Sequence, residues 1–181
     1  MEHKTVFDND FEILESDKNF KYQDILTKKL DSNKNIFDQN TLNEIILWKV
    51  NRYAEFKENL ISEINSINPN QAQIDIEKTR TILRMLLNTK GVQLAMASTI
   101  LRFRNSKIYQ IIDQRVYRII NPRKELNLDN KNIDEQIDLY LSYLEDLTKI
   151  CKDLKINFKE ADRILYMADK RVNKGVKLKN Y

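Results

Sequence analysis

Scarcity of glycine and proline is the feature that most restricts how this chain can fold. The 181 residues include two glycines and two prolines. Antiparallel sheets use such residues in the turns between strands, whereas helix interiors exclude both. Lysine, glutamate and leucine, which favour helices, are abundant. The sequence therefore predicts an all-α protein, a compact helical bundle of two small lobes with short polar loops.

Chain length and apolar content set the expected number of domains. An apolar fraction of 41% in a chain of this length can close one sizeable core, so we expect residues 1–181 to form a single unit. No apolar leader opens the sequence, and no run approaches the roughly 18 apolar residues of a membrane span. Cys151 is the only cysteine, which excludes an internal disulfide and a four-cysteine cluster. We expect a cytoplasmic protein without metal or cofactor.

Apolar residues recur at helical spacing along most of the chain. They predict a short helix near 22–30, a long amphipathic helix from 41 to 64, helices at 73–87 and 93–103, a short helix after Asp113, a helix over 137–154, and a last helix that begins at the capping signal of Asn157 and Glu160. The helices on either side of Gly91 form a candidate helix-hairpin-helix motif at about 76–104.

Basic residues are concentrated in one third of the chain. Residues 80–124 contain ten lysines and arginines and a single acid, Asp113, so this segment has a charge of +9 and the remainder, from a total of +4, has −5. Such a segment is typical of a nucleic-acid-binding surface, although a solvated basic face has the same composition. We expect duplex DNA as the partner, bound by Lys90, Gly91, Val92, Gln93, Leu94, Arg102, Arg104, Lys107 and Arg115.

Gly91 and Asp113 each allow two interpretations. A glycine between two helices can end the first one, or it can let a phosphate approach the backbone amides of residues 92–94. An aspartate before a short helix can cap that helix. It can also remain ionised among cations, where it would stabilise positive charge on a sugar or orient a water molecule.

The segment from Thr89 to Ser98, followed by the segment from Tyr109 to Ile119, resembles the helix-hairpin-helix superfamily of base-excision DNA glycosylases. That family has a Leu-Pro-Gly-Val-Gly hairpin and then an aspartate before a helix of the Val-Asp-Thr-His-Val-x-Arg type. Gly91 and Val92 match the hairpin, and Asp113, Val116 and Arg118 match the second element, which spans about 108–121. Two positions depart from the family pattern: Lys90 stands where the family usually has a proline, and Gln93 stands where it has its second glycine.

The resemblance implies a glycosylase that removes a damaged or modified base flipped out of duplex DNA, with Asp113 as the catalytic carboxylate. Ala95 stands where bifunctional members have a Schiff-base lysine, which implies a monofunctional enzyme. Trp48, Lys49 and Tyr53 are candidates for a base pocket, with Lys49 as an alternative amine, although such aromatic residues are more often core.

Two other functions remain open on the same residues. In a non-catalytic helix-hairpin-helix protein, the hairpin would hold DNA phosphates and Asp113 would only cap its helix. In a helical interaction protein, the basic face would meet an acidic protein partner instead of DNA.

Overall fold

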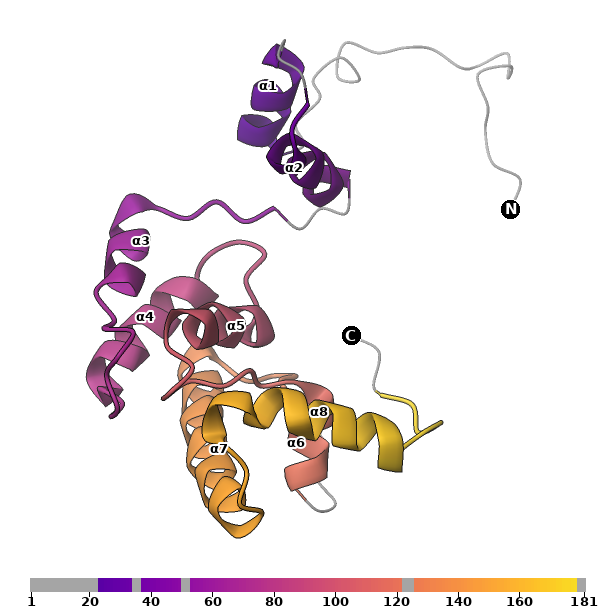
Figure 1. Cartoon of the computed structure of the whole chain (residues 1–181). Helices are drawn as coiled ribbons and strands as arrows, with labels where there is room; N and C mark the ends of the chain where they lie inside the picture. Colours follow the sequence, from indigo (N-terminus) through magenta and orange to yellow (C-terminus); the bar gives the residue numbers. More distant parts are fainter. Residues whose placement is uncertain (1–22, 34–36, 50–52, 122–125, 179–181) are drawn as a thin grey trace. The chain divides into compact units, whose positions relative to one another are not determined.

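The structure is a computed structural model that describes residues 23–33, 37–49, 53–121 and 126–178. These residues form helices and no strand, so the predicted all-α class is confirmed (Figure 1). None of the described helices is long and apolar enough to cross a membrane. The helices are α1 (Asp24–Ser32), α2 (Gln39–Lys49), α3 (Glu58–Asn65), α4 (Ile76–Leu87), α5 (Leu94–Arg104), α6 (Gln114–Ile120), α7 (Ile133–Asp153), the 3-10 turn η2 (Phe158–Glu160) and α8 (Ala161–Val172).

The chain divides into two compact units, whereas the sequence predicted one. The first unit is Met1–Tyr53, and its described part consists of α1 and α2, which pack against each other. The second unit is Ala54–Tyr181 and contains α3 to α8.

The predicted long helix over 41–64 is wrong. α2 ends at Lys49 and α3 begins at Glu58, and residues 53–57 are not helical. Phe56 lies in this non-helical stretch, where it packs against the core of the second unit. The helical spacing of apolar residues therefore continues across a non-helical segment, because such a segment can also pack apolar side chains against a core.

The core of the second unit is built around α7. The apolar stripe predicted for this helix is confirmed, since Ile137, Tyr140, Leu144 and Leu147 are all buried. α4 and α6 pack against α7, α4 also contacts α5, and α6 lies along α8. These contacts bring the helical hairpin of α4 and α5 and the short helix α6 into one folded unit.

The helix caps before α7 and α8 differ from those predicted from the sequence. Asn132 and Glu135 form a reciprocal capping box at the start of α7 that the sequence analysis did not identify. Asn157, by contrast, caps η2 by accepting the amide of Lys159, and α8 begins after Glu160.

Candidate functional site

The turn between α4 and α5 requires a glycine. Gly91 has a φ of +85°, and the Val92 amide closes the turn by donating to the Thr89 carbonyl at 3.0 Å. Glycine adopts this left-handed conformation at little cost, unlike other residues. A Cβ at Gly91 would have no atom within 4 Å, so the outer side of the turn is open.

Few amides of this turn face solvent. Val92 is 6% exposed and Leu94 is fully buried, so the predicted phosphate contacts from these two residues are wrong. Val92 fills the core, and its amide is already bonded within the turn. Gln93 is exposed, and its side chain makes no capping bond to α5. Of residues 92–94, whose amides were predicted to bind a phosphate, only Gln93 is therefore exposed.

Residues 105–113 form a non-helical segment, part of which is deeply buried. Ile108, Tyr109, Gln110 and Ile112 are at most 4% exposed. Backbone polar groups in such a position need protein partners. Side chains of α5 and α7 supply them: Tyr140 Oη donates to the Gln110 carbonyl at 3.0 Å, Tyr143 Oη donates to the Ile111 carbonyl at 2.7 Å, and the Ile112 amide donates to Ser98 Oγ at 3.2 Å. The three residues before Asp113 are thus held in place.

Asp113 caps α6 with one carboxylate oxygen. Oδ1 accepts from the amides of Arg115 at 2.8 Å and Val116 at 3.1 Å, so the capping interpretation is confirmed. Oδ2 has no hydrogen-bond partner among the described residues. The carboxylate is half-buried, and one of its oxygens remains available for another interaction.

A pocket of about 720 Å³ brings the hairpin and Asp113 together. Gln93 and Ala95, from the start of α5, line it beside Asp113. Its other described lining residues are Ile112, Gln114, Leu126, Leu128, Asp129, Gln136 and Leu178. This described lining provides apolar walls, side-chain amides and two carboxylates, without a lysine or arginine.

Sequence reasoning missed most of this lining. Gln114 directly follows Asp113 and could have been included for that reason. Asp129, Gln136 and Leu178 come from the region before α7, from α7 itself and from the segment after α8. No local pattern marks these residues, because only the packing of the helices brings them to Asp113.

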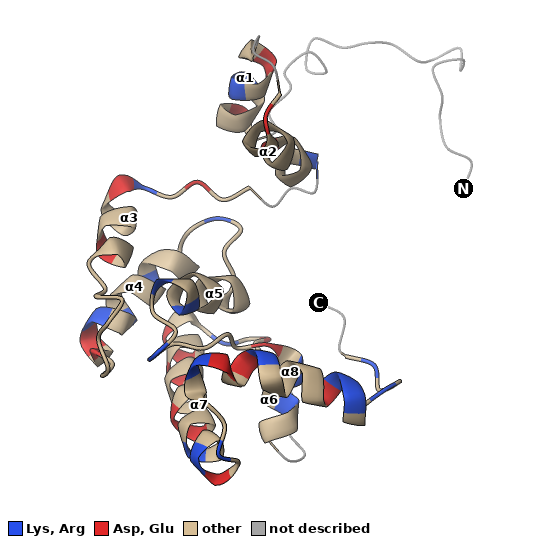
Figure 2. Ribbon diagram, viewed as in Figure 1, with Lys and Arg blue, Asp and Glu red and all other residues tan. Residues whose placement is uncertain are grey.

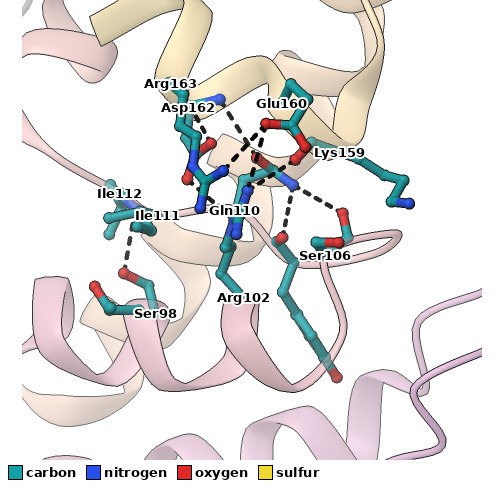
Figure 3. A network of polar contacts seen from close by, with 12 residues as sticks. Ser98, Arg102, Ser106, Gln110, Ile111, Ile112, Lys159, Glu160, Asp162 and Arg163 are labelled. Atoms are coloured by element: carbon teal, nitrogen blue, oxygen red, sulfur yellow. Dashed lines mark hydrogen bonds and ion pairs between the residues drawn. The ribbon is translucent and has the colours of Figure 1, made fainter.

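Arg102 is not a DNA-binding residue, contrary to the prediction. It is 6% exposed, its Nε lies 3.5 Å from Asp162 Oδ2, and its Nη2 donates to the Lys159 carbonyl at 3.1 Å (Figure 3). Gln110 joins the same network, since its Oε1 accepts the Asp162 amide at 3.3 Å. Arg102 therefore fastens α5 to the beginning of α8.

Arg104 is also largely used within the fold. Its Nε donates to the Ile64 carbonyl at 3.2 Å, and its Nη2 donates to the Asn65 carbonyl. These bonds satisfy the carboxyl end of α3. Lys107 and Lys90 are exposed, and Lys107 Nζ donates to Asn70 Oδ1 at 3.1 Å. Lys90, in the turn before α5, and Lys107, beyond the carboxyl end of α5, are therefore accessible cations.

Arg115 belongs to an ion cluster within the fold, and its predicted role at DNA stays a prediction. Asp169 of α8 is fully buried and accepts from Arg115 Nη1 at 3.1 Å. Arg118 binds the same carboxylate through both oxygens, from Nε at 2.7 Å and Nη2 at 2.8 Å. The hydrogen bonds from Arg118 are the main reason that the pKa of Asp169 is lowered to about 2. This cluster ties α6 to α8.

Most of the described cations in the basic segment face carboxylates from elsewhere in the chain. Residues 80–121 contain eight of the ten, and five of these eight are paired. The pairs are Arg80 with Asp138, Arg84 with Asp134, Arg102 with Asp162, and Arg115 and Arg118 with Asp169. Figure 2 shows acidic residues along α7 and α8. Much of the charge asymmetry along the sequence is thus balanced by internal and surface ion pairs.

The three weaker candidates lie in the first unit. Trp48 and Lys49 end α2, and the Trp48 Nε1 donates to Thr27 Oγ1 of α1 at 2.8 Å. Tyr53 is not helical, so these residues do not share the expected long helix. Their role at a base stays a prediction.

Comparison with models of protein families, with curated proteins and with solved structures found no match for this chain.

Proposed function

We propose that this chain is a monofunctional DNA glycosylase that hydrolyses the N-glycosidic bond of a damaged or modified base flipped out of duplex DNA. The observation that supports this function best is the pocket that Asp113 shares with Gln93 and Ala95 of the hairpin. One oxygen of the Asp113 carboxylate has no hydrogen-bond partner among the described residues, and the carboxylate lies at a pocket whose edge is the motif expected to approach DNA.

The chemistry requires a negative charge beside the sugar. As the bond between C1′ and the base nitrogen breaks, the sugar becomes oxocarbenium-like, and an ionised carboxylate stabilises that charge. Water then adds its hydroxyl to C1′, and its proton balances the charge on the departing base. Oδ2 of Asp113 is the group that would face the sugar, while Oδ1 keeps the carboxylate in place through the cap.

The remaining lining suits a base better than a phosphate. Side-chain amides of Gln93 and Gln136 are groups of the kind that read the edge of a flipped base. Ala95 lies in this pocket at the position that the family resemblance aligns with the lysine of bifunctional members. An alanine there provides no amine for a Schiff base, which favours hydrolysis over strand cleavage.

A second candidate function is a DNA-binding protein without catalysis. It is favoured by the complete local role of Asp113, whose Oδ1 already accepts two amides of α6. In that case the carboxylate would be structural, and DNA binding would not depend on its charge.

A helical protein that binds an acidic protein partner would instead show no affinity for DNA at low salt.

The first experiment measures base release from duplexes that carry 8-oxoguanine, uracil, hypoxanthine or an alkylated purine, with alkali to reveal abasic sites. Asp113→Asn keeps the cap, because asparagine caps helices as well as aspartate, and removes the charge. The matched control is Asp75→Asn, since Asp75 caps α4 by accepting the Lys78 amide at 3.0 Å and does not line the pocket.

We expect release by the wild-type protein and by Asp75→Asn, and a loss of at least about 100-fold in Asp113→Asn. Equal release by all three proteins would remove Asp113 from the chemistry. Duplex binding without release on any lesion would favour the non-catalytic function.

A further inference from the structure

The segment after α8 contains cations that the fold does not use. Residues 170–178 include four lysines and arginines and no acid. Lys170 and Arg171 lie in the last turn of α8, where positive charge stabilises the helix dipole. Lys174 and Lys177 lie beyond the helix, are exposed, and form no ion pair with another described residue. Helix stability therefore does not account for these two lysines.

The described part of this segment is folded back on the second unit. The Val176 amide donates to the Asn173 carbonyl at 3.1 Å, and Gly175 between them has a φ of +87°, as the third position of a type II turn requires. Arg118 of α6 then donates from Nη1 to the Val176 carbonyl at 3.4 Å. The turn is thus attached to α6, the helix that Asp113 caps.

The same segment reaches the pocket. Leu178 is part of the pocket wall together with Asp113 and Gln93. Lys177 directly precedes Leu178, and Lys174 lies on the other side of the turn at Gly175. Lys177 is therefore the sequence neighbour of a residue in the pocket wall, and Lys174 lies in the turn that Arg118 attaches to α6.

The negative charge of the pocket lining disfavours a phosphate inside the pocket. Its described lining includes Asp113 and Asp129 and no cation, so a phosphate inside would meet like charge. A nucleotide in the pocket nevertheless brings the phosphates on either side of it to the rim. Arg102 and Arg115, two cations that the sequence pattern offered for this purpose, are held by carboxylates.

We propose that Lys174 and Lys177 bind the phosphates of the DNA strand whose nucleotide enters the pocket. This inference rests on the DNA-binding part of the proposed function and does not require catalysis. It moves an important part of the DNA-binding surface from the segment over 80–124 to the turn after α8.

The test uses the full chain and a fluorescein-labelled, unmodified 20-base-pair duplex, with affinity measured by anisotropy over a series of salt concentrations. The variant is Lys174→Gln/Lys177→Gln. Its control is Lys152→Gln/Lys155→Gln, which removes the same amount of charge at the end of α7. Both of these lysines are exposed, and neither lines the pocket. Circular dichroism confirms that both variants are folded.

Each phosphate contact contributes about 0.9 to the slope of log affinity against log salt, so the variant is expected to lower the magnitude of that slope by about 1.8. The control should leave the slope unchanged, and Lys174→Arg/Lys177→Arg should retain the wild-type slope because arginine also binds phosphate. A variant slope equal to that of the control would overturn the inference.

The result also separates this inference from the catalytic proposal. A reduced slope without base release by the wild-type protein would support the lysines and contradict the glycosylase. Base release by the wild-type protein with an unchanged slope in the lysine variant would support the glycosylase and contradict the role of the lysines. A wild-type chain that binds no duplex would contradict both proposals.

Discussion

Individual residues in this protein have local structural roles that leave part of the side chain or backbone accessible. Asp113 was expected either to cap a helix or to act on a sugar; its Oδ1 caps α6 by accepting two amides, and its Oδ2 has no described hydrogen-bond partner. Gly91 likewise satisfies its turn and leaves open space beside it. A local structural role for a residue therefore does not exclude a functional one.

Substitution of Gly91 tests its backbone role. Gly91→Ala should lower the free energy of unfolding by about 1 kcal/mol, because an alanine at this positive φ is strained although its Cβ meets no atom. Gly91→Asn should cost less, since asparagine tolerates the left-handed region better. Urea unfolding measures both, and a Gly91→Ala protein as stable as the wild type would show that the turn adopts another conformation.

At the scale of elements, a buried non-helical segment is built into the helices around it. Residues 105–113 form no ladder of their own, and hydroxyls of Ser98, Tyr140 and Tyr143 complete the hydrogen bonds of residues 110–112. Burial raises the pKa values of Tyr140 and Tyr143 well above the ordinary range, so both phenols remain protonated donors. The position of Asp113 thus depends on α5 and α7 together.

Tyr143→Phe tests this dependence. It leaves the carbonyl of Ile111 without its donor, and we expect a loss of about 2 kcal/mol in the free energy of unfolding. Tyr117→Phe is the control, because the Tyr117 hydroxyl has no hydrogen bond within the described chain while its ring stacks on Tyr143 at 6.4 Å. Similar losses in both variants, measured by urea unfolding, would contradict the role of the hydroxyl.

At the scale of the whole second unit, ion pairs hold helices that are far apart in the sequence. Asp169 joins α8 to two arginines of α6, and Arg102 joins α5 to Asp162 of α8. Buried carboxylates need such partners, since an unpaired charge in the interior is costly. The position of α6, and with it the pocket at Asp113, therefore depends on charges outside the basic segment.

Acid should reveal the Asp169 cluster. The pKa of Asp169 is about 2 in the folded protein against an ordinary value of 3.8, so its stabilisation is present above pH 3.8 and is lost as the pH falls toward 2. Asp169→Asn should lower stability by about 3 kcal/mol at neutral pH. The difference from wild type, followed by thermal unfolding, should shrink toward pH 2; a difference independent of pH would contradict this assignment.

Local features were predictable from the sequence because they depend on neighbouring residues. Helical spacing and scarce glycine predicted the all-α class and the helices that became α4 and α5, and the aspartate before an apolar run predicted the cap of α6. The non-helical residues 53–57 were not predicted, because Phe56 continues the apolar spacing and packs against the core without being helical. The glycosylase activity stays a prediction from the motif resemblance.

Only the tertiary structure decided which charged residues are free and which residues line the pocket. Arg84 pairs with Asp134, 50 residues away, and Arg118 pairs with Asp169, 51 residues away, and no local pattern indicates either pair. The same packing brings Leu178 into one pocket with Asp113, while Lys174 and Lys177, which precede Leu178 in the sequence, remain exposed. The physical reason is that periodicity specifies which face of a helix is apolar, whereas the partner of each charge depends on which helices meet.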